Sequence, residues 1–300
     1  MKNIFITGAT SGLGLITACE LASQGHKVIA TARSIERGHE LTNYYYQHYS
    51  ISKGSIEIVI CDLLSFASIV NACAYVNKSN SHLDILINNA GVWNFSYRES
   101  ADHIEQIFQV NVLAPILINH LLLDLLLKSS NAKSIFTASA LHQGNVDFAN
   151  LEFKNGFSGF KAYRQSKLEI ILLCRLLAEK FKNSTIGFYC QHPGLVNTKL
   201  GRDANWFSRL FFQTMGRSPT KGAQTLIYLA EANKKKLVSG EYYAKMKVKK
   251  LTHQSYNLHV AARLLSRINI CLKHFSGPDS LIFGRPQPEA KIHPGNNSVL

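Results

Sequence analysis

Short apolar runs alternate with longer amphipathic segments through the N-terminal half of the chain and on to residue 190. The runs are rich in β-branched residues and too short for helices, so they predict strands. Their continuous hydrophobicity is typical of a parallel sheet that helices cover on both faces. The predicted strands are Asn3–Thr7, Lys27–Thr31, Ser55–Cys61, Leu83–Ile87, Lys133–Thr137 and Thr185–Cys190.

The segments between these runs have helical periodicity, and the first predicts an amphipathic helix at Gly14–Gln24. The most apolar stretch, Val112–Leu127, contains Pro115, Asn119 and Asp124. It is too short and too polar to span a bilayer. We interpret it as a buried helix.

Two regions interrupt this alternation. Residues 145–160 are polar, aromatic and glycine-bearing, which predicts an inserted loop. The chain from Gly277 onward holds four of the seven prolines and little periodicity, which predicts a flexible tail. We therefore expect one α/β domain over residues 1–276 and a tail over residues 277–300.

Composition narrows the class of protein. The chain is 46% hydrophobic and 17% charged, which is typical of a globular protein. Its net charge of +14 predicts attraction to anions such as a phosphorylated cofactor, lipid headgroups or nucleic acid. The six cysteines form no C-x-x-C pair and no cluster with histidine, so we expect no metal and a reduced, cytoplasmic protein. The first strand follows Met1-Lys2 directly, which leaves no room for a signal peptide.

A glycine-rich turn follows the first predicted strand and precedes a helix. Glycine lets the backbone turn sharply and approach a pyrophosphate, and the helix N-terminus offers free N–H groups. Many strand-to-helix turns hold glycine for tightness alone, but this strand–turn–helix context favours a dinucleotide site. The candidate cofactor-binding residues are Gly8, Thr10, Ser11, Gly12, Leu13 and Gly14.

The end of the second strand distinguishes between two cofactors. Proteins that bind NAD usually carry Asp or Glu there, to hold the ribose 2′-hydroxyl. This strand ends Thr31-Ala32-Arg33, without an acidic residue. An arginine can pair with the 2′-phosphate of NADP(H) by charge-assisted hydrogen bonds. We favour this role for Arg33 over that of a solvated surface charge, and expect NADP(H).

Two later segments end at the same edge of the predicted sheet. Asp62 and Leu63 follow the third strand, where the carboxylate either accepts from the adenine amino group or caps the next helix; both interpretations stay open. Asn89, Ala90 and Gly91 follow the fourth strand. Ligands bind at this edge in open α/β sheets, so these residues are cofactor-binding candidates too.

Tyr163 and Lys167 begin a further predicted helix. Their spacing of four places both on one helical face. A cation beside the phenol favours the phenolate, so we expect Lys167 to lower the pKa of Tyr163 toward the range of an acid/base catalyst. A Tyr-x-x-x-Lys pair is common by chance; Ser139 at the end of the fifth strand and the preceding motifs make it specific.

Over about residues 3–200 the chain resembles the classical short-chain dehydrogenase/reductase family. The matching motifs are T-G-A-T-S-G-L-G from Thr7, N-N-A-G from Asn88, Asn111, Ser139, Y-R-Q-S-K from Tyr163, and H-P-G from His192 with Thr198. The resemblance implies a single Rossmann-type, doubly wound parallel sheet with helices on both faces. It also implies hydride transfer between a nicotinamide cofactor and an alcohol or carbonyl group.

The resemblance assigns a role to each matching residue. Tyr163 would be the general acid/base, and Lys167 would tune it and hold the nicotinamide ribose. Ser139 would hydrogen-bond the reacting oxygen, and Asn111 would organise a proton relay. The remaining cofactor-binding candidates are Pro193, Gly194, Val196 and Thr198.

Within the family the chain is most similar to the retinol dehydrogenase branch, whose substrates are hydrophobic. The similarity rests on Ala32-Arg33, on residues 138–142, on the long stretch with Asn150-Leu151, and on residues 239–243 and 262–266. The chain departs from that branch at Ala138, where a serine is usual, and it lacks both the N-terminal anchor of many members and a counterpart for its tail. We expect an apolar alcohol or carbonyl substrate (retinoid, steroid or other lipid-like compound). The alternative is a catalytically silent, redox-sensing dinucleotide-binding protein.

Aromatic side chains, with one leucine, gather in segments expected at the carboxyl edge of the sheet, and the segment 205–212 is the one that forms the substrate lid in this family. They are Trp93, Phe95, His142, Phe148, Trp206, Phe207, Leu210, Phe211 and Phe212, the His142 side chain either orienting substrate or capping a loop. Lysines at 234–236 and 245–250 form either a solvated face or a peripheral contact with anionic membranes. No nucleic-acid-binding module accompanies them, so nucleic acid is not expected as a partner. A homo-oligomer is a further open alternative.

Overall fold

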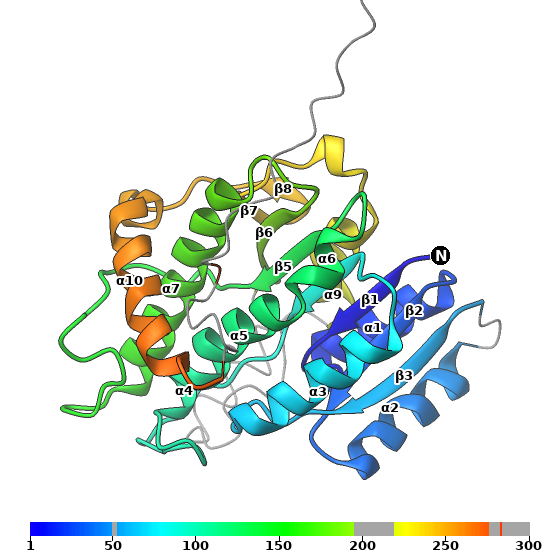
Figure 1. Cartoon of the computed structure of the whole chain (residues 1–300), viewed down its shortest axis with the longest axis horizontal. Coiled ribbons are helices and arrows are strands. Elements are labelled where there is room, and N and C mark those ends of the chain that lie inside the picture. The colour runs from blue at the N-terminus through cyan, green and yellow to red at the C-terminus, as the bar shows by residue number, and fades with distance from the viewer. Residues whose placement is uncertain (50–52, 195–218, 276–282, 284–300) are drawn as a thin grey trace, which may run out of the picture.

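The computed structural model describes residues 1–49, 53–194, 219–275 and 283, which form an α/β fold around one central sheet (Figure 1). The strand order is β3-β2-β1-β4-β5-β6-β7-β8, and every pair is parallel except β7 with β8. This order confirms the predicted Rossmann-type, doubly wound sheet. The strands are β1 (Asn3–Ile6), β2 (Lys27–Ala32), β3 (Ser55–Ile60), β4 (Ile85–Asn88), β5 (Lys133–Thr137), β6 (Gly187–His192), β7 (Tyr242–Ala244) and β8 (Lys247–Val248).

Helices cover both faces of the sheet because successive side chains of a buried strand point to opposite sides. In β1, Ile4 and Ile6 pack into one apolar cluster and Phe5 into the other. The first cluster is closed by α1 (Gly12–Ser23), α2 (Ile35–His48) and α9 (Pro219–Glu231). The second is closed by α3 (Phe66–Ser79), α5 (Ala114–Leu121), α6 (Leu123–Leu127) and α7 (Gly159–Lys180), with α10 (Leu258–Leu272) outside α7.

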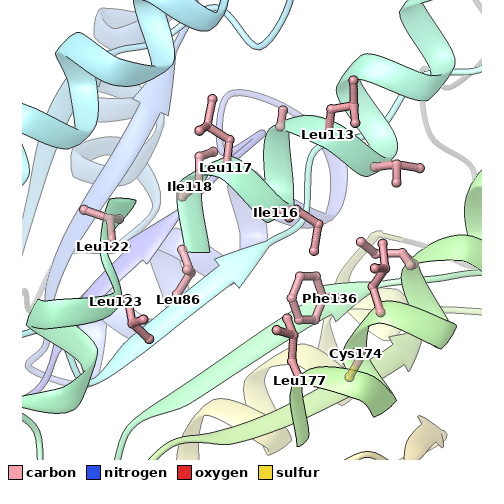
Figure 2. Close-up of a cluster of buried hydrophobic side chains, with 14 of the residues drawn as sticks. Leu86, Leu113, Ile116, Leu117, Ile118, Leu122, Leu123, Phe136, Cys174 and Leu177 are labelled. Atoms are coloured by element: carbon pink, nitrogen blue, oxygen red, sulfur yellow. The ribbon is translucent and has the colours of Figure 1, made fainter. Parts of the chain in front are cut away.

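The larger cluster fills the space between the sheet, α5 and α7 (Figure 2). Leu86 of β4 and Phe136 of β5 face Ile116 of α5 and Leu177 of α7, and all four side chains are buried. Burial of side chains of this size contributes about 1.5–3 kcal/mol each. This packing fixes α7, the helix that carries Tyr163, against the sheet.

The predicted strands are all present, but their ends differ in ways that matter for the site. The strands β4 and β6 extend to Asn88 and His192, one and two residues beyond the predicted ends. The strands β7 and β8 were not predicted, because three and two residues are too few to show a period. The helix α7 begins at Gly159, so Tyr163 lies in its second turn and does not begin it.

The apolar stretch at 112–127 is buried, as predicted, but it is not one helix. The short α4 (Gln106–Phe108) leads into a π-helix, Gln109–Leu113, and then into α5, which ends before Leu122. Pro115 lies at the start of α5, directly after the π-helix, and has no N–H to donate to the preceding helical turn. Among the described helices, none combines the length and hydrophobicity needed to cross a bilayer.

Two short 3₁₀-helices, η2 (Lys234–Lys236) and η3 (His253–Tyr256), complete the described elements. The chain from residue 138 to Ser158 has no helix or strand, as expected for the inserted loop. Of the predicted tail, residues 277–300, the structure describes Phe283, which is buried against His120 and Phe181. The rest of the tail lies outside the described residues, and its flexibility stays a prediction.

Candidate active site

The glycine turn between β1 and α1 is packed directly against the loop that follows β4. Gly8 and Gly12 have positive φ angles of 67° and 56°, which side chains other than glycine rarely adopt. A Cβ atom on Gly8 would lie 2.8 Å from the Ala90 Cα, and one on Gly14 would collide with the Gly8 carbonyl oxygen. The structure therefore brings the two predicted cofactor-binding segments together and leaves no room for a side chain between them.

Asn89 holds this arrangement from within. Its Nδ2 donates to the carbonyl oxygens of Thr7 and Gly8, at 3.1 and 3.2 Å. In return, the Thr7 Oγ1 accepts from the backbone N–H groups of Asn89 and Ala90, at 3.1 and 3.2 Å. The predicted ligand Asn89 thus uses its amide group to fix the turn. Sequence reasoning missed Thr7, although it begins the quoted motif.

The N-terminus of α1 fits an anionic group. Ser11 occupies the N-cap position without a side-chain hydrogen bond to the helix, so it does not satisfy the first-turn N–H groups. Gly12, Leu13 and Gly14 form that first turn. The donors, the positive end of the helix dipole and the glycine backbone together fit the pyrophosphate of a dinucleotide.

Arg33 follows the carboxyl end of β2 and is exposed. It has no hydrogen-bond or ion-pair partner among the described residues. Its neighbour Arg37, by contrast, pairs with Glu40 at 2.6 Å. The guanidinium of Arg33 is therefore available to a ligand at the same edge as the glycine turn.

Asp62 does not cap the next helix, which removes one of the two interpretations of this residue. The N-cap of α3 is Ser65, whose Oγ accepts from the Ser68 N–H. Asp62 instead accepts from the Leu64 N–H at 3.1 Å and so closes a local turn. Leu63 is buried beside it, and its carbonyl oxygen accepts from Gln109.

Tyr163 is 7% exposed, and its side chain is hydrogen-bonded to that of Ser139. Burial raises the pKa of Tyr163 to about 12, while the hydrogen bond with Ser139 acts in the opposite direction. The prediction that Lys167 lowers this pKa is wrong for this structure. The Lys167 Nζ lies 5.4 Å from the centre of the phenol ring and donates to the Thr137 carbonyl oxygen at 3.0 Å.

Lys167 is also buried, and desolvation lowers its pKa to about 8. Its surroundings include the loop after β4, since a Cβ atom on Gly91 would lie 3.4 Å from the Lys167 Nζ. The same Cβ would lie 3.3 Å from the Asn111 Oδ1. Gly91 is therefore the point at which the predicted cofactor loop meets two predicted catalytic residues.

Asn111 lies in the π-helix, a feature that sequence periodicity does not reveal. Its Oδ1 accepts from the Val92 N–H at 2.8 Å, and its Nδ2 donates to the Val92 carbonyl oxygen and to the Ser166 Oγ, both at 3.0 Å. Asn111 thus ties the loop after β4 to α7. In this structure its contacts are those of a positioning residue; Ser166, its partner, was not among the predicted site residues.

Aromatic side chains flank the tyrosine. The Trp93 ring stacks on that of Tyr163 with centroids 4.5 Å apart, and Phe95 and Phe160 lie 5.7 and 6.1 Å from Trp93. Trp93 and Phe95 thus lie where they were expected. Phe148 does not: it packs under Arg263 of α10.

His142 caps its own loop, since its Nδ1 donates to the Ser139 carbonyl oxygen at 2.8 Å. This contact favours the loop-capping interpretation of that side chain. Gly194, with φ of 88°, and Pro193 follow β6 at the same edge. Val196, Thr198 and the predicted lid residues Trp206, Phe207, Leu210, Phe211 and Phe212 lie outside the described residues. The described part of the chain holds no group of three or more His, Cys, Asp or Glu side chains placed to bind a metal ion.

Comparisons with known proteins agree with this geometry. The family model described as short chain dehydrogenase matches residues 2–207. Human retinol dehydrogenase 14 is 33% identical over 285 residues, covering 88% of this chain and 84% of the relative. An uncharacterised protein from Mycobacterium paratuberculosis has a similar structure, with a TM-score of 0.73, 24% identity and coverage of 91% and 94% of the two chains. The NADPH-bound carbonyl reductase from chicken fatty liver aligns with a TM-score of 0.59, 23% identity and coverage of 81% and 95%.

Proposed function

The chain belongs to the short-chain dehydrogenase family, and we propose that within this family it is an NADP(H)-dependent oxidoreductase that interconverts an apolar alcohol and its aldehyde or ketone. Membership confirms the resemblance noted in the sequence, including the retinol dehydrogenase branch. The observation that carries the proposal is the convergence of Ser139, Tyr163, Lys167 and Asn111 at the carboxyl edge of the sheet. The catalytic domain would span residues 1–276.

The bound nicotinamide would supply or accept the hydride, and the residues of the chain would handle the proton. In the reductive direction, the Tyr163 hydroxyl donates its proton to the oxygen that develops negative charge as the carbonyl carbon is reduced. The Ser139 hydroxyl hydrogen-bonds the same oxygen. In the oxidative direction, Tyr163 takes the proton back. Lys167 retains N–H groups beyond its bond to Thr137 with which to bind the nicotinamide ribose.

NADP(H) is favoured over NAD(H) by the end of β2. Arg33 is exposed and has no described partner, and no acidic residue follows the strand until Glu36. A carboxylate there would repel the 2′-phosphate, whereas a guanidinium binds it in a bidentate manner. The structural similarity to an NADPH-bound carbonyl reductase supports the same choice.

An apolar, lipid-like substrate is favoured by the aromatic side chains beside Tyr163. Trp93 shields one face of the phenol, and Phe95 and Phe160 extend this surface outward. Such a wall binds apolar compounds and excludes water from the reacting oxygen. Similarity to retinol dehydrogenase 14 supports a retinoid, steroid or related carbonyl. The proposal includes a cytoplasmic location with peripheral association with anionic membranes.

The direct test is NADPH oxidation, measured with the purified full chain over a panel of apolar aldehydes and ketones, retinal included. Tyr163→Phe keeps the ring but cannot exchange a proton, so turnover should fall by about 10²–10⁴-fold with cofactor binding retained. A wild-type protein that binds NADPH but turns over no compound in the panel would favour the redox-sensing alternative.

Arg33→Asp tests the cofactor half of the proposal. It removes the partner of the 2′-phosphate and adds a repulsive charge, so kcat/KM should shift toward NADH by about 100-fold or more. Arg37→Asp is the matched control, because Arg37 carries the same charge but already pairs with Glu40. A wild-type protein that prefers NADH would contradict the assignment of Arg33.

A further inference from the structure

The hairpin formed by β7 and β8 projects at the same edge of the sheet as the candidate active site. In the parallel pairing of β6 with β7, Ala244 lies opposite His192, the last residue of β6. The chain then turns at Lys245 and Met246, and β8 returns antiparallel, with Lys247 opposite Ala244. The hairpin tip therefore lies beside the strand end that leads to Pro193 and Gly194.

The two residues of the turn have a backbone conformation that suits neither of them. Lys245 and Met246 have φ angles of 52° and 61°, the positive pair of a type I′ turn. Asn-Gly is the favoured sequence for this turn, because the left-handed conformation costs other residues about 1–2 kcal/mol each. A lysine and a methionine at these positions thus oppose the stability of the hairpin, which indicates that their side chains have a separate role.

The surface of the hairpin is basic and partly apolar. Residues 245–250, K-M-K-V-K-K, are all exposed, and Met246 and Val248 are 43% and 46% exposed. The sequence from residue 242 to residue 278 contains seven Lys and Arg residues and no Asp or Glu. Glu241, just before it, is bonded to Arg175 at 3.2 Å. The stretch itself therefore supplies no acidic side chain that could neutralise the hairpin lysines.

We propose that the β7–β8 hairpin is the surface by which this protein docks on an anionic lipid bilayer, with Met246 and Val248 entering the headgroup region and the lysines pairing with lipid phosphates and carboxylates. Each lysine near an anionic bilayer strengthens binding, and exposed apolar side chains add to it. The proposal rests on the peripheral membrane association included in the proposed function and identifies the surface that would make the contact. It does not depend on the cofactor or on the identity of the substrate.

A lipid surface fits the hairpin better than a macromolecular partner. All four basic residues of the segment 245–250 are lysines. Protein interfaces are depleted in lysine and enriched in arginine, and single-stranded nucleic acids are held by aromatic stacking and arginine. Docking by this tip would turn the carboxyl edge of the sheet, with Tyr163 and its aromatic neighbours, toward the bilayer. An apolar substrate dissolved there would then reach the site without crossing water.

The test is sedimentation of the full chain with vesicles of phosphatidylcholine alone or with phosphatidylserine added. We expect binding to the anionic vesicles at about 0.1 M salt, weaker binding at about 0.5 M, and none to neutral vesicles. Lys247→Glu with Lys249→Glu should lower the partition coefficient by about 30-fold or more, since each lysine contributes about fivefold. Absence of wild-type binding would overturn the proposal.

The matched control changes the same charge at the opposite edge of the sheet. Lys235 and Lys236 are exposed on η2, whose first residue, Lys234, is bonded to the Thr185 carbonyl oxygen ahead of β6. Lys235→Glu with Lys236→Glu should leave vesicle binding within about twofold of wild type, because these residues face away from a bilayer docked at the hairpin. Equal losses in both double variants would show that vesicle binding depends on the net charge of the protein and not on a defined surface. That result would overturn the proposal.

A third variant separates docking from folding. Lys245→Asn with Met246→Gly supplies the residues that a type I′ turn favours, so it should raise the Tm by about 2 °C or more. It should nevertheless weaken vesicle binding by about 10-fold, because one lysine and the apolar tip are lost. Turnover of a water-soluble aldehyde should stay unchanged in every hairpin variant. That readout tests the proposed oxidoreductase activity separately from docking. Unchanged vesicle binding by the Lys245→Asn, Met246→Gly variant would overturn the role of the hairpin tip.

Discussion

Two buried lysine side chains lie at the two ends of β5 and have different roles. Lys133 is the first residue of the strand, and the ammonium group of Lys167 donates to the carbonyl oxygen of Thr137, its last residue. They are 2% and 4% exposed, and desolvation lowers the pKa of each to about 8. By burial and by pKa alone the two residues are the same.

Their hydrogen bonds distinguish them. The Lys133 Nζ donates to the carbonyl oxygens of Leu229, Ala230 and Ala232, at 2.8, 2.9 and 2.5 Å, at the C-terminal end of α9. An ammonium has three donors, so all are used. For Lys167 the described residues supply one acceptor, the Thr137 carbonyl. A buried cation with spare donors beside a tyrosine can bind a ligand, whereas a saturated one holds the fold together.

The largest effect should come from Lys167→Met. The change removes the cation near Tyr163 and the donors predicted to hold the ribose, so kcat/KM should fall by about 100-fold or more. The free energy of unfolding should stay within about 1 kcal/mol of wild type, because loss of a buried charge offsets loss of one hydrogen bond. Steady-state kinetics and urea unfolding measure the two effects; a stable, fully active variant would contradict the catalytic assignment.

Lys133→Met should give the reverse pattern. It leaves the carbonyl oxygens of Leu229 and Ala232 without this donor, whereas that of Ala230 still accepts from the Lys2 Nζ at 3.1 Å. The free energy of unfolding should therefore fall by about 2 kcal/mol. Activity per folded molecule should stay within about twofold, because the residue lies at the far end of β5 from Tyr163. Urea unfolding with activity normalised to the folded fraction tests this; a specific loss of turnover would break the distinction between the two lysines.

The contribution of Lys133 to the free energy of unfolding should also depend on pH. The folded-state pKa of Lys133, about 8, lies below the ordinary lysine value of 10.5, so the unfolded chain binds more protons between these values. Stability due to this residue therefore rises with pH through that window, by at most about 1.4 kcal/mol per pH unit. The difference in unfolding free energy between wild type and Lys133→Met should widen from pH 8 to pH 10. A constant difference would mean that the lysine titrates alike in both states.

The smallest effect should come from Gly91→Ala. The added Cβ would lie 3.3 Å from the Asn111 Oδ1, which must shift by a few tenths of an ångström, and would be in van der Waals contact with the Lys167 Nζ at 3.4 Å. We expect kcat to fall by about 3- to 10-fold with little change in Tm. Gly25→Ala is a control for backbone strain away from the site: its φ of 95° disfavours any side chain, so the Tm should fall while kcat per folded molecule stays unchanged. Equal effects of both changes on kcat would show that the contacts of Gly91 with Asn111 and Lys167 do not matter for turnover.

Local patterns in the sequence were sufficient for much of the fold and for part of the site. The runs that became β1 to β6 were visible because a strand buried on both faces is continuously apolar. The pair Tyr163 and Lys167 was visible because a spacing of four repeats on one helical face. The role of Arg33 at the end of β2 was inferred from its place in a strand–turn–helix unit. Each of these signals spans a few residues of contiguous chain.

The features that the sequence did not predict depend on contacts between residues that are distant along the chain. Lys133 was a member of a predicted strand, and its role depends on carbonyl groups 96 to 99 residues away. The amide of Asn89 turned out to hold the glycine turn, and the expected lowering of the Tyr163 pKa was reversed by burial, which spacing along a helix cannot report. The hairpin at Lys245 and Met246 was visible as charge but not as a turn beside the site. Sequence periodicity fixes which face of an element is buried; what meets that face, and how much water is excluded there, depends on the packing of the whole chain.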